Sequence, residues 1–277
     1  MNLEINNNTA LTPEEKWEKA TIANNFIFYK VMRSNPDVCK RLLEILLEIE
    51  IDKINIYQEE TIDVDYASKG VRLDVYAKNA TQAFNVEMQT TNSKELAERS
   101  RYYQGIIDVD CLKSGQQYKE LKTTYIIFIC LDDVFKKGLA KYTFENLCLE
   151  DGKTKLNDRT QKVFYICKNY DKLLDARQKA FLRMVTQNSS SDDFTRRVGG
   201  LVENAKRNTQ WRQQFMEWDR EMACMRAKGR EEGREEGLAE GARQNAVENA
   251  RNFKAAGVDV NIIAKCVGLS VEEVEQL

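Results

Sequence analysis

The sequence contains no histidine. This absence removes the commonest general base, every Ser-His or Cys-His nucleophile system and every metal site with an imidazole ligand. The seven cysteines are scattered singly, without a Cys-x-x-Cys pair, so they fit reduced thiols better than a disulfide framework or a zinc site. Any chemistry in this chain must therefore use carboxylates, lysine, tyrosine, amides or a hard metal ion.

The chain also lacks a strong excess of charge and a long apolar run. Its 42 basic and 44 acidic side chains give a formal charge of −2, so a polyanionic partner must be met by a local patch. The longest apolar run, residues 125–131, is far shorter than the roughly 20 residues of a membrane-spanning helix, and the polar N-terminus has no signal-peptide segment. We therefore expect a cytoplasmic protein that has no membrane partner.

Local patterns predict helices at both ends of the chain and strands between them. Proline and acidic residues indicate helix starts at Pro13 and Pro36. Residues 54–90 read as short antiparallel strands, residues 94–112 as a helix, and the apolar run as a strand covered on both faces. The remaining predicted elements are strands at 141–144 and 162–167 and helices at 173–186 and 192–225. Strands followed by helices predict an α/β or α+β core with a helical extension.

Two acidic residues interrupt runs that otherwise read as buried strands. Alternation along a strand at residues 72–76 places Leu73 and Val75 on one face and Arg72, Asp74 and Tyr76 on the other. The same count places Glu87 and Gln89 on one face of the next strand. Twelve residues separate Asp74 from Glu87, which suits a hairpin of two short strands. Carboxylates on adjacent strands can hold Mg²⁺ together with water and a substrate phosphate.

Four sequence blocks stand in order along the chain: NFIFYKVM at 25–32, KGVRLDV at 69–75, NVEMQ at 85–89 and RSRYYQ at 99–104. They resemble the PD-(D/E)XK nuclease superfamily, whose signature is an aspartate that ends one strand and an (Asp/Glu)-x-Lys on the next. The closer resemblance is to the bacterial recombination-promoting nuclease (Rpn) family, also called PD-(D/E)XK nuclease family transposases. It covers most of the chain from about residue 20.

This resemblance implies an α/β, restriction-endonuclease-like core, which is a central mixed sheet flanked by helices, with a helical C-terminal extension. By position, Asp74 and Glu87 would bind Mg²⁺, or Mn²⁺ in its place, and Gln89 would complete the catalytic set where the motif has lysine. Glutamine can orient an attacking water, but it brings no positive charge and cannot take a proton. The metal would then carry more of the work.

The resemblance also implies substrate-binding residues on the helix after the second acidic strand. Related nucleases place phosphate-contacting side chains there, which here are Arg99, Arg101, Tyr103 and Gln104. Helical spacing lets Arg101 and Gln104 face the site together. The alternative is that the tyrosines pack the helix and the arginines are solvated. Relatives often carry an aspartate where this chain has Asn25, so a third acid near the metal would be missing.

We predict a nuclease-like domain at 1–188, a helical extension at 189–228, a linker at 229–250 and a small C-terminal module at 251–277. In the linker a glycine recurs every four residues, which on a helix forms one stripe. The stripe either lets two helices approach closely in an oligomer or belongs to a solvated linker. The module reads as a helix-turn-helix, but glutamates in its second helix favour docking over groove reading.

Two functions compete on this evidence. The first is a Mg²⁺-dependent DNA endonuclease that hydrolyses phosphodiester bonds, which the resemblance links to recombination, transposon-like transfer or defence against foreign DNA. The alternative is a catalytically degenerate nuclease fold that acts as a DNA- or partner-binding oligomeric module. The resemblance also implies a homo-oligomer formed through the C-terminal helices. A purely structural helical scaffold would leave the strand-borne acids unexplained.

Overall fold

The structure is a computed structural model, and it describes residues 11–57, 61–62, 71–91 and 94–277. Within these residues the helices are α1 (Pro13–Lys19), α2 (Asn25–Ser34), α3 (Pro36–Leu47), α4 (Leu96–Cys111), α5 (Ala176–Gln187), α6 (Asp193–Arg207), α7 (Thr209–Ala255), α8 (Val260–Val267) and α9 (Val271–Glu275). The strands are β1 (Asn55–Ile56), β2 (Thr61–Ile62), β3 (Val71–Arg72), β4 (Val75–Lys78), β5 (Gln82–Gln89), β6 (Thr123–Cys130), β7 (Lys141–Phe144) and β8 (Thr160–Ile166). Two 3-10 helices span Tyr118–Glu120 and Cys167–Lys172.

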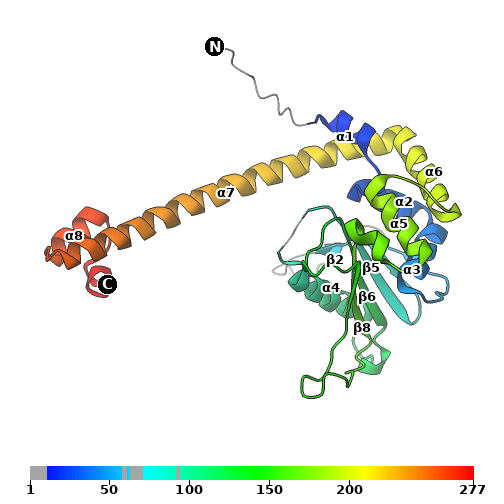
Figure 1. Cartoon of the computed structure of the whole chain (residues 1–277), viewed down its shortest axis with the longest axis horizontal. Coiled ribbons are helices and arrows are strands. Elements are labelled where there is room, and N and C mark those ends of the chain that lie inside the picture. Colours follow the sequence, from blue (N-terminus) through cyan, green and yellow to red (C-terminus); the bar gives the residue numbers. More distant parts are fainter. Residues whose placement is uncertain (1–10, 58–60, 63–70, 92–93) are drawn as a thin grey trace, which may run out of the picture. The chain divides into compact units, whose positions relative to one another are not determined.

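A six-stranded mixed sheet in the order β1-β4-β5-β6-β8-β7 forms the centre of the fold (Figure 1). Strands β4 and β5 are an antiparallel hairpin, whereas β6 runs parallel to both β5 and β8. The parallel pair β5 and β6 needs a crossover connection, and α4 lies within it. The predicted α/β fold, a central mixed sheet flanked by helices with a helical C-terminal region, is confirmed.

Helix α4 covers one face of the sheet. Its buried residues Leu96, Ile106 and Ile107 belong to one apolar cluster with Phe128 of β6 and Phe164 of β8. The two phenylalanine rings stack with centroids 5.2 Å apart. Because helices cover β6 on both faces, its sequence is a near-continuous apolar run rather than an alternating one.

Helices α2, α3 and α5 lie on the opposite face of the sheet from α4 (Figure 1). Helix α2 begins at Asn24, whose side chain accepts the N–H groups of Phe26 and Ile27. The predicted break between helices falls at Asn35 and Pro36, where α2 ends and α3 begins. Proline has no N–H to donate and restricts the residue before it, so a helix ends there.

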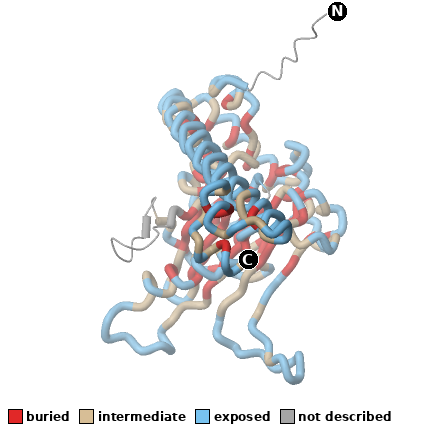
Figure 2. Tube along the Cα trace, turned by 90° about the vertical axis from the view of Figure 1, so that its left-hand side faces the viewer, coloured by how far each residue is buried: buried red, intermediate tan, exposed pale blue. Residues whose placement is uncertain are grey.

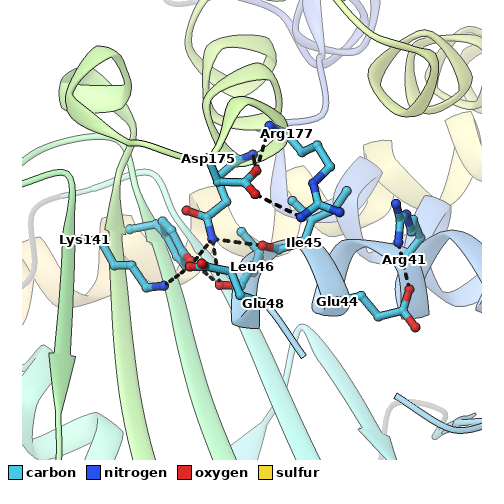
Figure 3. Close-up of polar contacts among 10 residues, drawn as sticks. Arg41, Glu44, Ile45, Leu46, Glu48, Lys141, Asp175 and Arg177 are labelled. Carbon is cyan, nitrogen blue, oxygen red and sulfur yellow. Dashed lines mark hydrogen bonds and ion pairs between the residues drawn. The ribbon is translucent and has the colours of Figure 1, made fainter. Parts of the chain in front are cut away.

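A polar cluster closes the C-terminal end of α3 (Figure 3). Gln178 of α5 donates through Nε2 to two carbonyls of the last turn, at 2.9 and 3.3 Å, and to the Glu48 carboxylate at 2.9 Å. The Tyr165 hydroxyl of β8 donates to the Leu46 carbonyl, and Lys141 Nζ donates to Glu48 at 3.0 Å. These residues, Leu46, Glu48, Lys141, Tyr165 and Gln178, are the α3 cluster. They satisfy carbonyls that a helix end leaves unpaired.

The strand predicted over residues 72–76 is interrupted at Leu73 and Asp74. Leu73 packs in the same cluster as Tyr76, so the prediction that alternation separates them was wrong. The physical cause is local. The Asp74 N–H donates to the Glu87 side chain instead of to a strand carbonyl, and the chain bends at this point.

The helix predicted over residues 192–225 is two helices, α6 and α7, and the prediction of a single element was wrong. The break falls at Asn208, which has an extended backbone. The Asn208 side chain accepts the Trp211 N–H and so begins the next helix. An asparagine can cap a helix or lie within it, and the surrounding periodicity did not distinguish the two.

Residues 216–277 form a compact unit of their own. Glycines 229, 233, 237 and 241 lie inside α7 in exposed positions (Figure 2), and nothing lies within 4 Å of where a Cβ would stand. Helices α8 and α9 pack on the end of α7 through Ala250, Ile263, Ala264 and Val274. The turn between them uses Gly268 at a φ of 73°. Across the described parts of the chain, no helix has the length and apolar character needed to cross a membrane.

Candidate active site

The antiparallel register of β4 and β5 places Asp74 beside Glu87. Val75 pairs with Val86, and the two acids are the next residues outward on their strands. The Asp74 N–H donates to Glu87 Oε1 at 3.0 Å, and the Met88 N–H donates to Asp74 Oδ2 at 3.0 Å. These reciprocal hydrogen bonds hold the two carboxylates side by side, and we call Asp74 and Glu87 the acid pair.

Arg99, from the first turn of α4, extends to the same place. Its Nη1 donates to Gln89 Oε1 at 3.1 Å, and its Nη2 donates to the Tyr103 hydroxyl at 3.0 Å. The same Nη2 lies 3.7 Å from Glu87 Oε2. The guanidinium carbon also lies 5.4 Å from the centre of the Tyr103 ring and 5.7 Å from that of Phe128. Arg99 therefore contacts Glu87 of the acid pair and joins Gln89 and Tyr103 to it.

Gln89 is held from both ends of its amide. Its Oε1 accepts from Arg99, and its Nε2 donates to the backbone carbonyl and the hydroxyl of Thr91. With only 8 % of its surface exposed, the side chain has a fixed orientation. The amide therefore presents its oxygen to the guanidinium rather than to the acid pair.

The acid pair is partly buried, and its charges repel each other. Glu87 is 4 % exposed, while Asp74 is only partly buried. Burial raises the pKa of Glu87 well above its usual range, and the Asp74 charge raises it further, against the opposing effects of the Asp74 N–H and of Arg99. Burial, and then the charge of Glu87, also raises the pKa of Tyr103. For Glu87, burial and the Asp74 charge therefore outweigh the opposing effect of the Arg99 guanidinium on its pKa.

Asn85 shares the face of β5 that carries Glu87, because it precedes Glu87 by two residues. It is fully buried, and within the described residues neither its amide nitrogen nor its amide oxygen has a partner at hydrogen-bond geometry, although the amide is close enough to Glu87 to oppose the rise in the pKa of that carboxyl. A buried amide without partners is costly, and such groups cluster where a structure serves function. We had not predicted a site role for this residue. Its position two residues before the acid was the available signal.

Arg101 and Gln104 point in different directions from α4. Arg101 is exposed, whereas Gln104 is 7 % exposed and donates to both carboxylate oxygens of Asp108, at 3.0 and 3.1 Å. The Thr124 hydroxyl also donates to Asp108, at 3.3 Å. Burial raises the pKa of Asp108. The helical spacing predicted that Arg101 and Gln104 face the site together. In the structure Arg101 is exposed to solvent and Gln104 is buried against Asp108.

The donor chemistry of the acid pair fits a hard divalent cation. Among the described residues no group of three or more acidic or cysteine side chains is arranged to hold a metal ion, so the donor set here is two carboxylates. Mg²⁺ commonly binds one or two carboxylates and keeps several water ligands. Burial, and then the charge of Asp74, raises the pKa of Glu87, and such an ion would neutralise these two adjoining acids.

Parts of the surroundings of the acid pair lie outside the described residues. Segments 63–70 and 92–93 flank Asp74 and Gln89 in sequence. The predicted block at 69–75 is therefore described only from residue 71 onward, and the side chain of Arg72 is not described. The contacts given above all come from described side chains.

One family model matches the chain. It is described as PD-(D/E)XK nuclease family transposase and spans residues 24–188, which hold the acid pair, Gln89 and α4. No curated protein and no solved structure matches the chain.

Proposed function

The chain belongs to the PD-(D/E)XK nuclease family transposases, and from this premise we propose that it is a Mg²⁺-dependent DNA endonuclease. In this proposal Asp74 and Glu87 bind the metal ion, with Mn²⁺ as a substitute, and Gln89 belongs to the catalytic set. Arg99, Arg101, Tyr103 and Gln104 are the proposed substrate-binding residues, of which Arg99 contacts Glu87 and Tyr103 contacts Arg99.

The observation that carries this proposal is the convergence of the acid pair. The Asp74 N–H lies 3.0 Å from Glu87 Oε1, although twelve residues separate the two acids. Two carboxylates with a guanidinium beside them make a site in which a phosphodiester can meet both a cation and a positively charged side chain. A divalent ion bound there would lower the pKa of a water and stabilise negative charge on the phosphate.

The proposed reaction is hydrolysis. A water oxygen forms a new bond to phosphorus, the bond between phosphorus and one sugar oxygen breaks, and that oxygen takes up a proton as the water loses one. Residues of this chain would hold the ion, orient the phosphate and balance its charge. With no histidine in the sequence, no imidazole takes part in the proton transfer.

The test is cleavage of supercoiled plasmid in Mg²⁺, Mn²⁺, Ca²⁺ or a chelator. Asp74→Ala and Glu87→Ala should each lower the nicking rate at least about a hundredfold, because each removes a metal ligand. Glu203→Gln is the control, since Glu203 is an exposed acid on α6. Nicking at the parental rate by both alanine variants would contradict the proposal.

One observation favours the second candidate, a degenerate nuclease fold that binds DNA or a partner. Glu87 already has a positive neighbour in Arg99 and exposes little surface, so its carboxylate is less available to an ion than a solvated one. Calorimetric titration with Mg²⁺ separates the candidates. Saturable binding that Asp74→Ala removes supports the enzyme, and the absence of such binding supports the degenerate fold.

We also propose a homo-oligomer formed through the C-terminal helices. Support comes from residues of α7 that recur at spacings of four and three, namely Trp218, Met222 and Met225, of which Met225 is 57 % exposed. Light scattering of the full chain tests this, with Met222→Lys and Met225→Lys expected to lower the mass. A monomer at every concentration would contradict the oligomer. The proposed link to recombination, transposon-like transfer or defence rests on the family resemblance, whereas the proposed cytoplasmic location rests on the scattered cysteines, which fit reduced thiols.

A further inference from the structure

The strand position that carries lysine in the family signature is neutral in this chain. Gln89 stands there, two residues after Glu87 on the same face of β5. A lysine at the same Cα would end one atom farther out than the glutamine amide and would carry a positive charge. The glutamine alone leaves the acid pair without a cation from β5.

A cation nevertheless stands beyond the end of the Gln89 side chain. Arg99 Nη1 lies 3.1 Å from Gln89 Oε1, and Arg99 Nη2 lies 3.7 Å from Glu87 Oε2. The guanidinium therefore occupies the neighbourhood that a lysine ammonium at residue 89 would reach. It comes from α4 rather than from β5, and the amide of Gln89 fixes one of its nitrogens.

The contacts of Arg99 differ from those of an ordinary buried ion pair. Arginine commonly meets a carboxylate through two parallel hydrogen bonds of about 2.7 to 2.9 Å. Here the shortest contacts of Arg99 are to the neutral groups of Gln89 and Tyr103, while the contact to Glu87 is longer and single. Its side chain is 33 % exposed, compared with 5 % for that of Glu87. The Arg99 guanidinium is therefore not held in a close ion pair with Glu87, and part of the Arg99 side chain is open to solvent.

Resting on the nuclease function proposed above, we propose that Arg99 supplies the positive charge that the motif otherwise places at residue 89, and that Gln89 and Tyr103 position it. The guanidinium would stabilise the negative charge that develops on the phosphate during hydrolysis. A guanidinium supplies positive charge, but it does not serve as a general base as a lysine amine can. Asp74 and Glu87 would then bind the ion, and Arg99 of α4 would supply the positive charge of the protein.

The experiment exchanges the charge between the helix and the strand. Arg99→Gln should lower kcat for plasmid nicking about a hundredfold, with a smaller change in KM. Adding Gln89→Lys to that variant should raise kcat at least about tenfold, because the new lysine on β5 supplies the missing positive charge. Arg99→Lys should keep more activity than Arg99→Gln. Arg183→Gln, which removes an exposed arginine on α5, is the matched control and should nick at the parental rate.

Metal affinity provides a readout that does not depend on cleavage. Because Arg99 repels a second cation near Glu87, Arg99→Gln should bind Mg²⁺ or Mn²⁺ several-fold more tightly, and the double variant should return toward the parental affinity. Arg99→Gln should therefore raise the metal affinity while it lowers kcat. A general loss of structure would weaken both properties together.

The outcomes separate the two proposals. If the parental protein binds the ion but nicks no DNA, the endonuclease proposal fails. A metal affinity that rises in Arg99→Gln and falls again when Gln89→Lys is added would still show that the charge of Arg99 acts on the acid pair. If Arg99→Gln nicks like the parental protein, or if Gln89→Lys gives no recovery in a folded double variant, the role of Arg99 is overturned while the endonuclease stands. If Arg99→Gln does not fold, Tyr103→Phe is the alternative, because it keeps the charge of Arg99 but removes one of its hydrogen bonds. An unchanged kcat in Tyr103→Phe would contradict the proposal that Tyr103 positions Arg99.

Discussion

Two polar clusters lie on opposite faces of the same sheet and differ in how well their charges and hydrogen bonds are balanced. In the α3 cluster, Gln178 makes three hydrogen bonds and the Glu48 carboxylate faces Lys141 (Figure 3). At the acid pair, the Arg99 guanidinium lies 3.7 Å from the Glu87 carboxylate, the Asp74 charge adds to burial in raising the pKa of Glu87, and the buried Asn85 amide has no partner at hydrogen-bond geometry among the described residues. The first arrangement closes a helix end. The second leaves an electrostatic deficit that a ligand can fill.

The pKa directions express the same difference. The Lys141 ammonium, together with Gln178, lowers the pKa of Glu48, so the folded protein favours its ionised form. Burial and the charge of Asp74 raise the pKa of Glu87, so the folded protein opposes its ionised form. Polar groups that stabilise the fold are satisfied within it, whereas groups held for binding are left incompletely satisfied.

The largest expected effect separates activity from stability at the acid pair. Glu87→Gln should lower the nicking rate at least about a hundredfold, because a neutral amide is a poor metal ligand. It should not lower the free energy of unfolding, because it removes one of two adjoining like charges. Plasmid nicking and urea denaturation measure the two quantities. A large loss of stability would mean that Glu87 is a structural residue, like those of the α3 cluster.

The second largest effect is a loss of stability without a loss of activity, at the α3 cluster. Gln178→Leu should lower the free energy of unfolding by about 2 to 3 kcal/mol, because it leaves buried carbonyls of α3 without a donor. Nicking should be unchanged under conditions in which the protein is folded. Gln187→Leu, at an exposed position on the same helix, is the control. Equal stability of the two variants would remove the contrast between the clusters.

A smaller effect is expected at Asn85. Because its amide has no partner within the described chain, Asn85→Leu should change the free energy of unfolding by less than about 1 kcal/mol in either direction. Denaturation beside Gln178→Leu is the direct comparison. A loss as large as that of Gln178→Leu would show that the amide is hydrogen-bonded in solution and would weaken the contrast.

The smallest effect concerns pH and Glu48. Its folded pKa lies below the unfolded value of about 4.3, so its contribution is present above that value and is lost as pH falls through the folded pKa. Half of the side chain is exposed, so the contribution should stay below about 1 kcal/mol. Unfolding curves from pH 6 to pH 3 for the parental protein and for Glu48→Gln should converge at the acid end. Parallel curves would contradict it.

The sequence was sufficient to predict several of the elements and the approach of the two acids. Apolar runs and helix-start signals located β6, β7 and α3, because these signals depend on neighbouring residues alone. The same reasoning failed at Leu73 and Asp74, where a side chain thirteen residues away takes the backbone N–H and bends the strand. It failed again at Asn208, whose capping role depends on the direction of the next helix.

Arg99 illustrates what local patterns leave undetermined at the site. Its place on a helix and its spacing to Tyr103 were readable, since residues four apart lie on one helical face. Its contact with Gln89 depends on how α4 crosses the sheet, and its approach to Phe128 depends on the pairing of β5 with β6. Both contacts depend on tertiary packing. The sequence therefore predicted Arg99 as a substrate-binding residue but did not predict its contact with Gln89, the neutral residue at the motif position.

The route of the chain through β4, β5 and the start of α4 has a genetic consequence. The acid pair, Gln89, Arg99 and Tyr103 all come from the single continuous stretch of residues 74–103. One short coding segment therefore carries the whole centre, so an exchange between genes with breakpoints outside that segment transfers it intact. Position 89, where the motif has lysine, and Arg99 lie within the same segment, so an exchange of charge between them needs no change elsewhere in the gene.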